Sequence, residues 1–336
     1  MKRFCSALCL VLGAFLFSLT EIYAETNFNL YQLTNDNTDD GFPSLYDGTI
    51  AWVKGSGENR EIYYWDGVTT TRITNNDTAD TNPCVFDGAI AWQGKVSAED
   101  DDFEIFYWPG WGYDLDEPIQ ITDNDYDDVD PSLHNGMIAW SGGDGERNEI
   151  YFWDGDTITN ISDNGSDNKT PSLYFGTIAW SGGGTAQRDY EIYYWDGETI
   201  SILTDNSYDD TNPSLYNGAI AWTGGEGNNS EIYYWDGRTT KRITEDNTPD
   251  DGPSLYGGAI AWNRLSGQTF EIFYYDGITT IQITADGYRQ DTAPSLYKGI
   301  IAWNGRDPSD FEIYYVIPGP KPELDDSPCF LSVLDF

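Results

Sequence analysis

The chain has 336 residues, of which 57 are acidic and 17 are basic, so its formal net charge is −40. A field of this sign repels phosphate backbones and anionic lipid, and we therefore expect neither nucleic-acid binding nor docking on a membrane surface. A single histidine and the absence of G-x-S-x-G and H-E-x-x-H motifs give no support to serine-hydrolase or histidine-ligated metal chemistry. Glycosidase or lyase chemistry with paired carboxylates stays open, because acidic side chains are abundant.

Residues 1–24 have the composition of a secretory signal peptide. Lys2 and Arg3 precede the apolar run 4–19, and Ala24 is a small residue at a suitable cleavage position. An uncleaved membrane anchor is the alternative, but the apolar run is short for crossing a bilayer. The sequence therefore predicts a secreted, periplasmic or cell-surface protein with no membrane insertion after cleavage.

A unit of about forty residues follows this leader and is repeated seven times. Each copy reads approximately P-S-L-Y-x-G-x-I-A-W, then E-I-Y-Y-W-D-G, then a segment that ends in I-T. In the fifth copy, Asn217-Gly218 and Asp236-Gly237 separate short segments rich in aromatic and β-branched residues. Asn-Gly and Asp-Gly suit two-residue hairpin turns, because both central residues need positive φ. Each copy is therefore predicted to be a four-stranded antiparallel sheet.

The third strand of each copy is apolar or aromatic on both faces, so each sheet must be covered on both sides, as in the blades of a β-propeller. The last copy stops after residues 312–315 and lacks a fourth strand, whereas residues 31–34, ahead of the first copy, have the fourth-strand pattern. We predict an all-β, seven-bladed β-propeller of four-stranded antiparallel blades at residues 25–316. The N-terminal strand closes the ring by completing the last blade.

The two hairpin turns of each blade are expected on one face of the ring and the longer, acidic loops on the other. Three residues before each Pro stands a column of carboxylates, interrupted once by Asn168: Asp40, Asp80, Asp128, Asp210, Asp250 and Asp291. One interpretation is a ring of oxygen ligands for Ca²⁺ at the channel mouth. The other is that each Asp accepts hydrogen bonds from backbone N–H groups of its own turn.

The second copy departs most from the repeat. It has extra residues around Asp100, Asp101 and Asp102, and Pro109-Gly110-Trp111-Gly112-Tyr113 replaces its Asp-Gly turn. Trp111 and Tyr113 lie outside the repeated columns and are predicted either to contact a protein partner or a glycan, or to fold back on their own blade. By contrast, the tryptophans that end the second strands are predicted to pack between blades: Trp52, Trp92, Trp140, Trp180, Trp222, Trp262 and Trp303.

The third copy begins with the densest group of carboxylates in the chain: Asp123, Asp125, Asp127, Asp128 and Asp130. Their alternation resembles that of calcium-loop ligands, although the Gly and the distal Glu of an EF-hand are missing. This group is the strongest sequence candidate for Ca²⁺, with a merely solvated loop as the alternative. His134 occupies the Tyr position of P-S-L-Y and is predicted to be structural.

Residues 317–336 form a Pro-rich C-terminal tail that contains Cys329. Cys84 replaces the Ser of P-S-L on an inner strand. The alternatives for these two cysteines are unpaired thiols and, in an oxidising compartment, a disulfide.

The order P-S, then I-A-W, then E-I-Y-Y-W-D-G, then I-T-x-N over residues 28–316 resembles the repeat of TolB-like β-propellers. Those repeats typically continue Pro-Ser with Trp-Ser-Pro-Asp-Gly, where this chain has Leu-Tyr-Asp-Gly or Leu-Tyr-Asn-Gly. The resemblance covers the propeller only, since no TolB N-terminal domain is present. It implies a non-catalytic periplasmic or extracellular scaffold for protein contacts.

Together these observations predict a monomeric, non-catalytic binding or scaffold propeller. Its acidic loop face would engage a basic protein surface or a divalent cation, and Ca²⁺ is the one cofactor that the sequence suggests. The alternative is a carbohydrate-binding or carbohydrate-cleaving propeller that uses Trp111, Tyr113 and the rim carboxylates. No residue is assigned a catalytic role.

Overall fold

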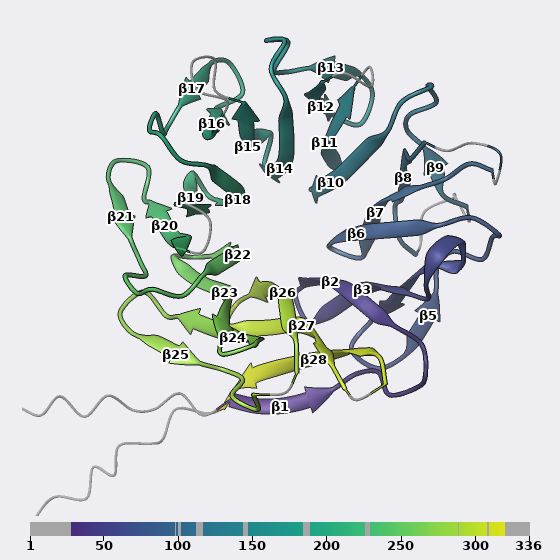
Figure 1. Cartoon of the computed structure of the whole chain (residues 1–336). Helices are drawn as coiled ribbons and strands as arrows, with labels where there is room; N and C mark the ends of the chain where they lie inside the picture. Colours follow the sequence, from purple (N-terminus) through teal and green to yellow (C-terminus); the bar gives the residue numbers. More distant parts are fainter. Residues whose placement is uncertain are drawn as a thin grey trace, which may run out of the picture. The chain divides into compact units, whose positions relative to one another are not determined.

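The computed structural model describes residues 28–319 except 98, 100–101, 112–116, 144–146, 184–188, 226–228, 288 and 308. Seven four-stranded antiparallel sheets surround a central axis (Figure 1), so the predicted fold class is confirmed. The leader and all but the first residues of the predicted tail lie outside the described residues. Within the described residues, no helix combines the length and apolar character needed to cross a membrane.

Blades 1 to 6 follow one another along the chain, and each contains four consecutive strands. The strands of blades 1 to 3 are β2 (Asp40–Tyr46), β3 (Thr49–Lys54), β4 (Glu61–Trp65), β5 (Thr70–Arg72); β6 (Asp80–Phe86), β7 (Ala89–Gly94), β8 (Glu104–Trp108), β9 (Ile119–Gln120); β10 (Asp128–His134), β11 (Met137–Gly143), β12 (Asn148–Trp153) and β13 (Ile158–Asn160). A short 3-10 helical turn, η1 (Gly57–Asn59), lies between β3 and β4.

The strands of blades 4 to 6 are β14 (Asn168–Tyr174), β15 (Thr177–Gly183), β16 (Tyr190–Trp195), β17 (Ile200–Ile202); β18 (Asp210–Tyr216), β19 (Ala219–Gly224), β20 (Glu231–Trp235), β21 (Thr240–Arg242); β22 (Asp250–Tyr256), β23 (Ala259–Ser266), β24 (Thr269–Tyr275) and β25 (Thr280–Gln282). Blade 7 contains β26 (Asp291–Tyr297), β27 (Ile300–Arg306), β28 (Phe311–Pro318) and β1 (Phe28–Gln32).

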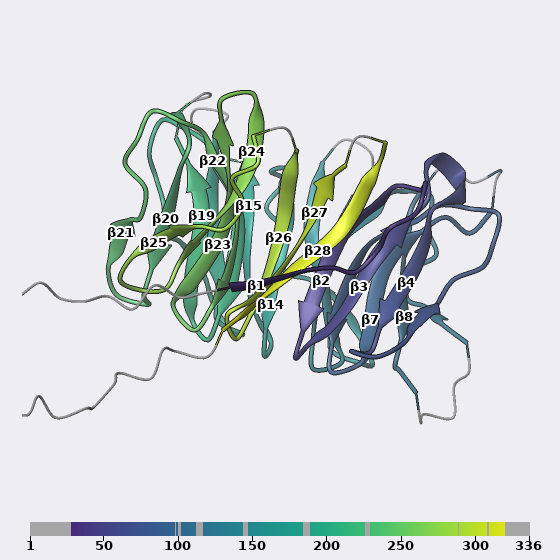
Figure 2. The same cartoon turned by 90° about the horizontal axis from the view of Figure 1, so that it is seen from below.

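The ring is closed by the first strand, as the sequence predicted. β1 pairs antiparallel with β28, with Tyr31 opposite Tyr315, and their rings stack at 5.0 Å between centroids. Seen from the side, β1 runs along β28 (Figure 2). The strand begins three residues earlier than the predicted 31–34, and β28 extends into Ile317 and Pro318, which the sequence assigned to the tail. Leu33 continues the contact by donating its N–H to the carbonyl of Ile313.

Tight turns between the first two strands of a blade form the hairpin face of the ring. At Asp47-Gly48 the φ angles are 45° and 85°, and at Asn217-Gly218 they are 50° and 77°. Positive φ at both positions matches the twist of the flanking strands and is available to Asn, Asp and Gly at little steric cost. Two blades have other residues at the first position: Phe175 of blade 4, which is 60% exposed, holds φ 45°, and Lys298 of blade 7 holds φ 50°.

The hydrophobic core lies between the blades. Ala179 and Ile192 of blade 4 pack against Leu215, Ile220 and Trp222 of blade 5, and equivalent clusters fill the other gaps. The seven repeated tryptophans are 0–1% exposed, so their predicted place between blades is confirmed. Aromatic and β-branched residues therefore cover both faces of each sheet, because each blade is sandwiched between two others.

A ring of hydrogen bonds links the seven innermost strands. The Oγ of the Ser in each Pro-Ser pair accepts the N–H of the following blade's Leu or Val; Leu45 donates to Ser295 at 2.9 Å across the closure between blades 7 and 1. Cys84 takes the Ser position in blade 2, and its Sγ accepts the N–H of Leu133 at 3.2 Å. The repeated Pro-Ser pair thus joins each blade to the next, as well as shaping its own strand.

Candidate functional site

The Asp column lies inside the junctions between blades, at neither of the two places that the sequence suggested. In each blade one side-chain oxygen accepts the indole N–H of the Trp twelve residues later, as in Asp40–Trp52, Asp80–Trp92 and Asp210–Trp222 at 2.8–2.9 Å. The equivalent bonds join Asp128 to Trp140, Asn168 to Trp180, Asp250 to Trp262 and Asp291 to Trp303. The column is buried, which contradicts the interpretation of a carboxylate ring at the channel mouth.

Each junction pairs this Asp with a Glu from the third strand of the preceding blade. Glu104 of blade 2 and Asp128 of blade 3 share a donor residue, since Asn124 donates its backbone N–H to Glu104 and its side-chain amide to Asp128, each at 2.7 Å. Burial raises the pKa of Glu104 to about 7 and that of Asp210 to about 6. These carboxylates stabilise the junction best when a proton or a cation accompanies them.

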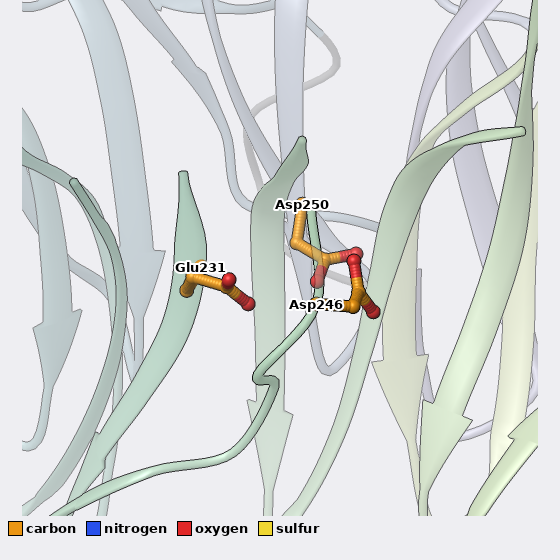
Figure 3. A group of neighbouring side chains, drawn as sticks. All are labelled: Glu231, Asp246 and Asp250. Carbon is orange, nitrogen blue, oxygen red and sulfur yellow. The ribbon is translucent and has the colours of Figure 1, made fainter. Parts of the chain in front are cut away.

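In some junctions a third carboxylate is balanced by a basic side chain. Figure 3 shows Glu231, Asp246 and Asp250 turned toward one another between blades 5 and 6. Arg264 binds Asp250 through two nitrogens, at 2.6 and 2.9 Å, and Asp246 at 2.9 Å. Its guanidinium lies over the ring of Phe273. This group of carboxylates is therefore an ion-pair network built into the fold.

Two other junctions also pair their carboxylates with a basic side chain. Lys54 bridges Asp36 and Asp40 between blades 7 and 1. Between blades 6 and 7, where Gly305 replaces the basic residue, Arg289 pairs with Asp286 at 3.1 Å and lies over Tyr314, as Arg264 lies over Phe273. The sequence signal for this network was available: Lys54 and Arg264 each lie fourteen residues after an Asp whose preceding loop carries a second Asp.

The predicted calcium loop does not form one site. Asp123, Asp125 and Asp127 are exposed, and Asp127 accepts the backbone N–H of Phe103. Asp128 is buried against Trp140, whereas Asp130 points to Asn82 of the neighbouring blade at 3.1 Å. Asp123 and Asp128 instead line a cavity of about 780 Å³ together with Tyr126, Arg147 and Glu149. The register shift between Val129 and Ser132 turns Asp130 away from Asp128, so the five carboxylates do not converge.

Trp111 packs on its own blade and remains exposed, and contact with a partner or glycan stays a prediction. It is 59% exposed, and it packs edge-on against Trp108 of its own blade at 4.4 Å between ring centroids and against Tyr64 of blade 1 at 5.5 Å. Asp102 is half-buried at the start of blade 2's third strand. Tyr113, Asp100 and Asp101 lie outside the described residues.

The central channel is the hollow that all seven blades share. A cavity of about 480 Å³ is lined by the Pro-Ser pairs and by the residue before each Pro. That preceding residue holds positive φ, because a register shift in the first strand turns it toward the axis. Its identity varies around the ring as Phe42, Asn82, Asp130, Thr170, Asn212, Gly252 and Ala293. The most variable position of the repeat therefore lines the channel.

A side pocket of about 440 Å³ adjoins the channel between blades 7 and 1, and Phe42 and Ala293 line both hollows. Phe311 and Val53 add further apolar surface, and Arg60 lies at the edge with its Nε donating to the carbonyl of Gly57. The pocket lies on the loop face, opposite the tight turns. Phe42 is 53% exposed at φ 53°, a conformation that bulky residues rarely adopt.

Seven aromatic rings encircle the axis at the hairpin face. Tyr46, Phe86, His134, Tyr174, Tyr216, Tyr256 and Tyr297 form a closed circle with neighbouring centroids 4.2–4.9 Å apart. The ring of Tyr256, for example, lies 4.5 Å from that of Tyr216 and 4.7 Å from that of Tyr297 between centroids, so these side chains converge. The channel is therefore a cup, open at the loop face and narrowed by aromatic rings at the hairpin face.

His134 belongs to this aromatic ring, and its predicted structural role is confirmed. It is 8% exposed, its Nδ1 accepts the backbone N–H of Phe175, and burial lowers its pKa to about 4. The imidazole is thus neutral near pH 7.

Several similar solved structures are peptidases or parts of them. The β-propeller domain of the Trilobed protease from Pyrococcus furiosus, described as having an open velcro topology, has a TM-score of 0.67 at 14% identity, over 85% of this chain and 97% of that one. A puromycin-hydrolysing peptidase of Mycobacterium tuberculosis has a TM-score of 0.63 at 13% identity, over 87% and 54%. An acylaminoacyl peptidase of Pyrococcus horikoshii has 0.63 at 14%, over 86% and 52%. The chain thus spans about half the length of the latter two.

No family model and no curated protein matches the chain, so its resemblance to TolB-like repeats stays a prediction. The predicted non-catalytic scaffold or binding module is wrong. Similar structures include the propeller domain of a protease and two peptidases, so a propeller of this kind is not clearly non-catalytic. The same finding runs against the alternative of a carbohydrate-binding or carbohydrate-cleaving propeller. At these identities the likeness itself shows the shared fold alone.

Proposed function

We propose that this chain is a peptidase-type propeller whose cup-shaped channel receives a segment of a peptide substrate. The observation that carries the proposal is that the channel and an apolar side pocket adjoin on the open loop face, with Phe42 and Ala293 lining both. The fold shared with propellers of peptidases supports the choice of peptide as the ligand class.

The walls of the two hollows suit an extended peptide. Phe42, Val53 and Phe311 offer apolar contact for one side chain, and burying such a side chain contributes roughly 1.5–3 kcal/mol. Asn82, Thr170 and Asn212 around the channel offer polar groups to a peptide backbone. The narrowed hairpin end favours a segment that inserts and leaves by the same mouth.

The part of hydrolysis assigned to this chain is peptide binding. Bond cleavage needs a nucleophile and a base within hydrogen-bond reach of each other, and His134 is a neutral ring enclosed by aromatic side chains. In this proposal the propeller presents peptides to the bond-breaking groups of a peptidase.

The test exchanges two residues that hold equivalent positions in different blades. Phe42 and Ala293 both precede Pro at φ 53° and 54°, so each position tolerates the other's side chain without a new backbone conformation. We expect Phe42→Ala to weaken binding of short dye-labelled peptides by about tenfold, as for removal of an interface aromatic. We expect Ala293→Phe to change the affinity for the same peptides, because the larger side chain narrows the side pocket. Fluorescence anisotropy measures both.

Phe175→Asn is the matched control, because it changes an exposed aromatic on the opposite face to the Asn present at Asn135 and Asn217. It should leave peptide binding unchanged. The same peptides are followed by mass spectrometry, which reports any cleavage by the chain itself. Absence of peptide binding by the unmodified chain, or equal affinity of all variants, would contradict the proposal.

A further inference from the structure

Three carboxylates gather where the ring closes, in the loop between β27 and β28 and at the start of β28. Asp307, Asp310 and Glu312 each place one oxygen so that the three lie within 4.8 Å of one another. Glu312 is fully buried and Asp310 is 6% exposed, whereas Asp307 is half-buried and gives access from solvent.

One oxygen of each buried carboxylate has no hydrogen-bond partner: Oδ2 of Asp310 and Oε2 of Glu312. Their other oxygens are used, since Oδ1 of Asp310 accepts the Ser309 hydroxyl and Oε1 of Glu312 accepts the Asp36 N–H at 2.8 Å. A buried charged oxygen without a donor is costly, so these two atoms indicate a missing positive partner. A lone Glu oxygen recurs in four other blades, and a lone Asp oxygen recurs at the equivalent position of blade 4, on Asp189, but only at the closure does a third carboxylate, Asp307, join such a pair within 4.8 Å among the described residues.

The local charge balance points the same way. Asp36 and Asp40 also belong to this junction, and Lys54 pairs with both of them. Among the described residues, no basic side chain forms an ion pair with Asp307, Asp310 or Glu312. The junction between blades 5 and 6 has three carboxylates matched by Arg242 and Arg264. The closing junction therefore carries more carboxylates than the single Lys54 can balance.

We propose that Asp307, Asp310 and Glu312 bind a divalent cation, with Ca²⁺ as the ion that fits best. The donors are all carboxylate oxygens, which hard cations prefer, and Ca²⁺–oxygen distances of roughly 2.3–2.6 Å place opposite ligands just under 5 Å apart. The site differs from the calcium loop predicted at residues 123–130.

A cation here would stabilise the ring closure. Glu312 holds the N–H of Asp36, and Asp39 accepts the N–H of Phe311 at 3.1 Å, so the loop that follows β1 is fixed to the start of β28. Binding the ion to Glu312 and Asp310 ties the β27–β28 loop to the same contacts. Ligation to the folded chain alone raises stability by mass action.

The test is calorimetric titration of the purified chain with Ca²⁺ and with Mg²⁺ after chelator treatment, alongside thermal unfolding with and without Ca²⁺. Asp310→Asn and Asp307→Asn are compared with Asp125→Asn, which removes an exposed carboxylate of the loop that the sequence favoured. We expect saturable Ca²⁺ binding, a higher Tm with Ca²⁺, loss of one binding site or at least about tenfold weaker binding in the first two variants, and no change in Asp125→Asn.

Circular dichroism without Ca²⁺ shows whether each variant is folded. If Asp310→Asn does not fold, Asp307→Asn still tests the site. Absence of saturable Ca²⁺ binding overturns the proposal, as does binding that both site variants retain unchanged. Loss of binding in Asp125→Asn alone would move the site to the 123–130 loop and also overturn it. Tighter binding of Mg²⁺ would keep the site and overturn the choice of ion.

Discussion

At the scale of the residue, the seven blades act as natural variants of one another, and the Asp–Trp pair shows what this reveals. Six blades use Asp to accept the buried indole N–H, and blade 4 uses Asn168 for the same bond to Trp180. A neutral acceptor is therefore compatible with the geometry. The bond to the indole, and not the negative charge, is the feature that all blades share.

We expect Asp210→Asn to fold with nearly unchanged stability at pH 7, because Oδ1 can still accept the N–H of Trp222. Asp210→Ala should lose about 1–3 kcal/mol, because the indole N–H would be buried without an acceptor. Urea unfolding of both variants measures the difference. An Ala variant as stable as the Asn variant would show that the indole does not depend on this bond.

At the scale of the element, the five-residue strand β1 holds the closure of the ring together. It provides the outer strand of blade 7, and the residues after it supply Thr34, whose hydroxyl accepts the N–H of Ile313, and Asp36. Removing it leaves β28 as an exposed edge and separates the first blade from the last.

We expect deletion of residues 25–36 to abolish the single cooperative thermal unfolding transition. Calorimetry and near-ultraviolet circular dichroism measure this transition. A circularly permuted chain is the control: Phe28 lies opposite Pro318, so residues 28–36 attached after β28 through a short turn can pair in the same register. The permuted chain should regain the melt. An unchanged cooperative melt in the deleted chain would mean that the ring does not depend on β1.

At the scale of the whole molecule, the buried carboxylates set the response to pH. Burial raises the pKa of Asp40 and Glu104 to about 7 and of Asp80, Asp210 and Asp291 to about 6. Between the unfolded values near 4 and these folded values, the folded state holds more protons than the unfolded state. The free energy of unfolding therefore falls as pH rises through this range.

Turn carboxylates act in the opposite direction at lower pH. Backbone N–H groups lower the pKa of Asp66, Asp154, Asp196 and Asp236, so their contribution is present above about pH 4 and is lost in stronger acid. We expect the Tm to be highest between about pH 4 and pH 5.5 and to decrease toward pH 8, as measured by calorimetry of dilute protein. Asp210→Asn should have a shallower decrease, and a Tm that rises steadily from pH 5 to pH 8 would contradict this account.

The sequence by itself determined the number of blades, their strands, the closing strand and the buried tryptophans, because these follow from local patterns: the period of the repeat, alternation along strands and Asn-Gly or Asp-Gly turns. It also singled out Trp111 and His134 as departures from the repeat. These features need only neighbouring residues to be recognised.

Only the tertiary structure decided where the carboxylates lie and which residues share a hollow. Asp128 and Asp130 are two apart in sequence yet face a blade junction and the channel, whereas Asp307 and Glu312 meet at the closure beside Asp36, at the other end of the described chain. Such groupings depend on the angle between blades and on the register shift before each Pro. These are set by packing between strands that the chain brings together only when the ring closes.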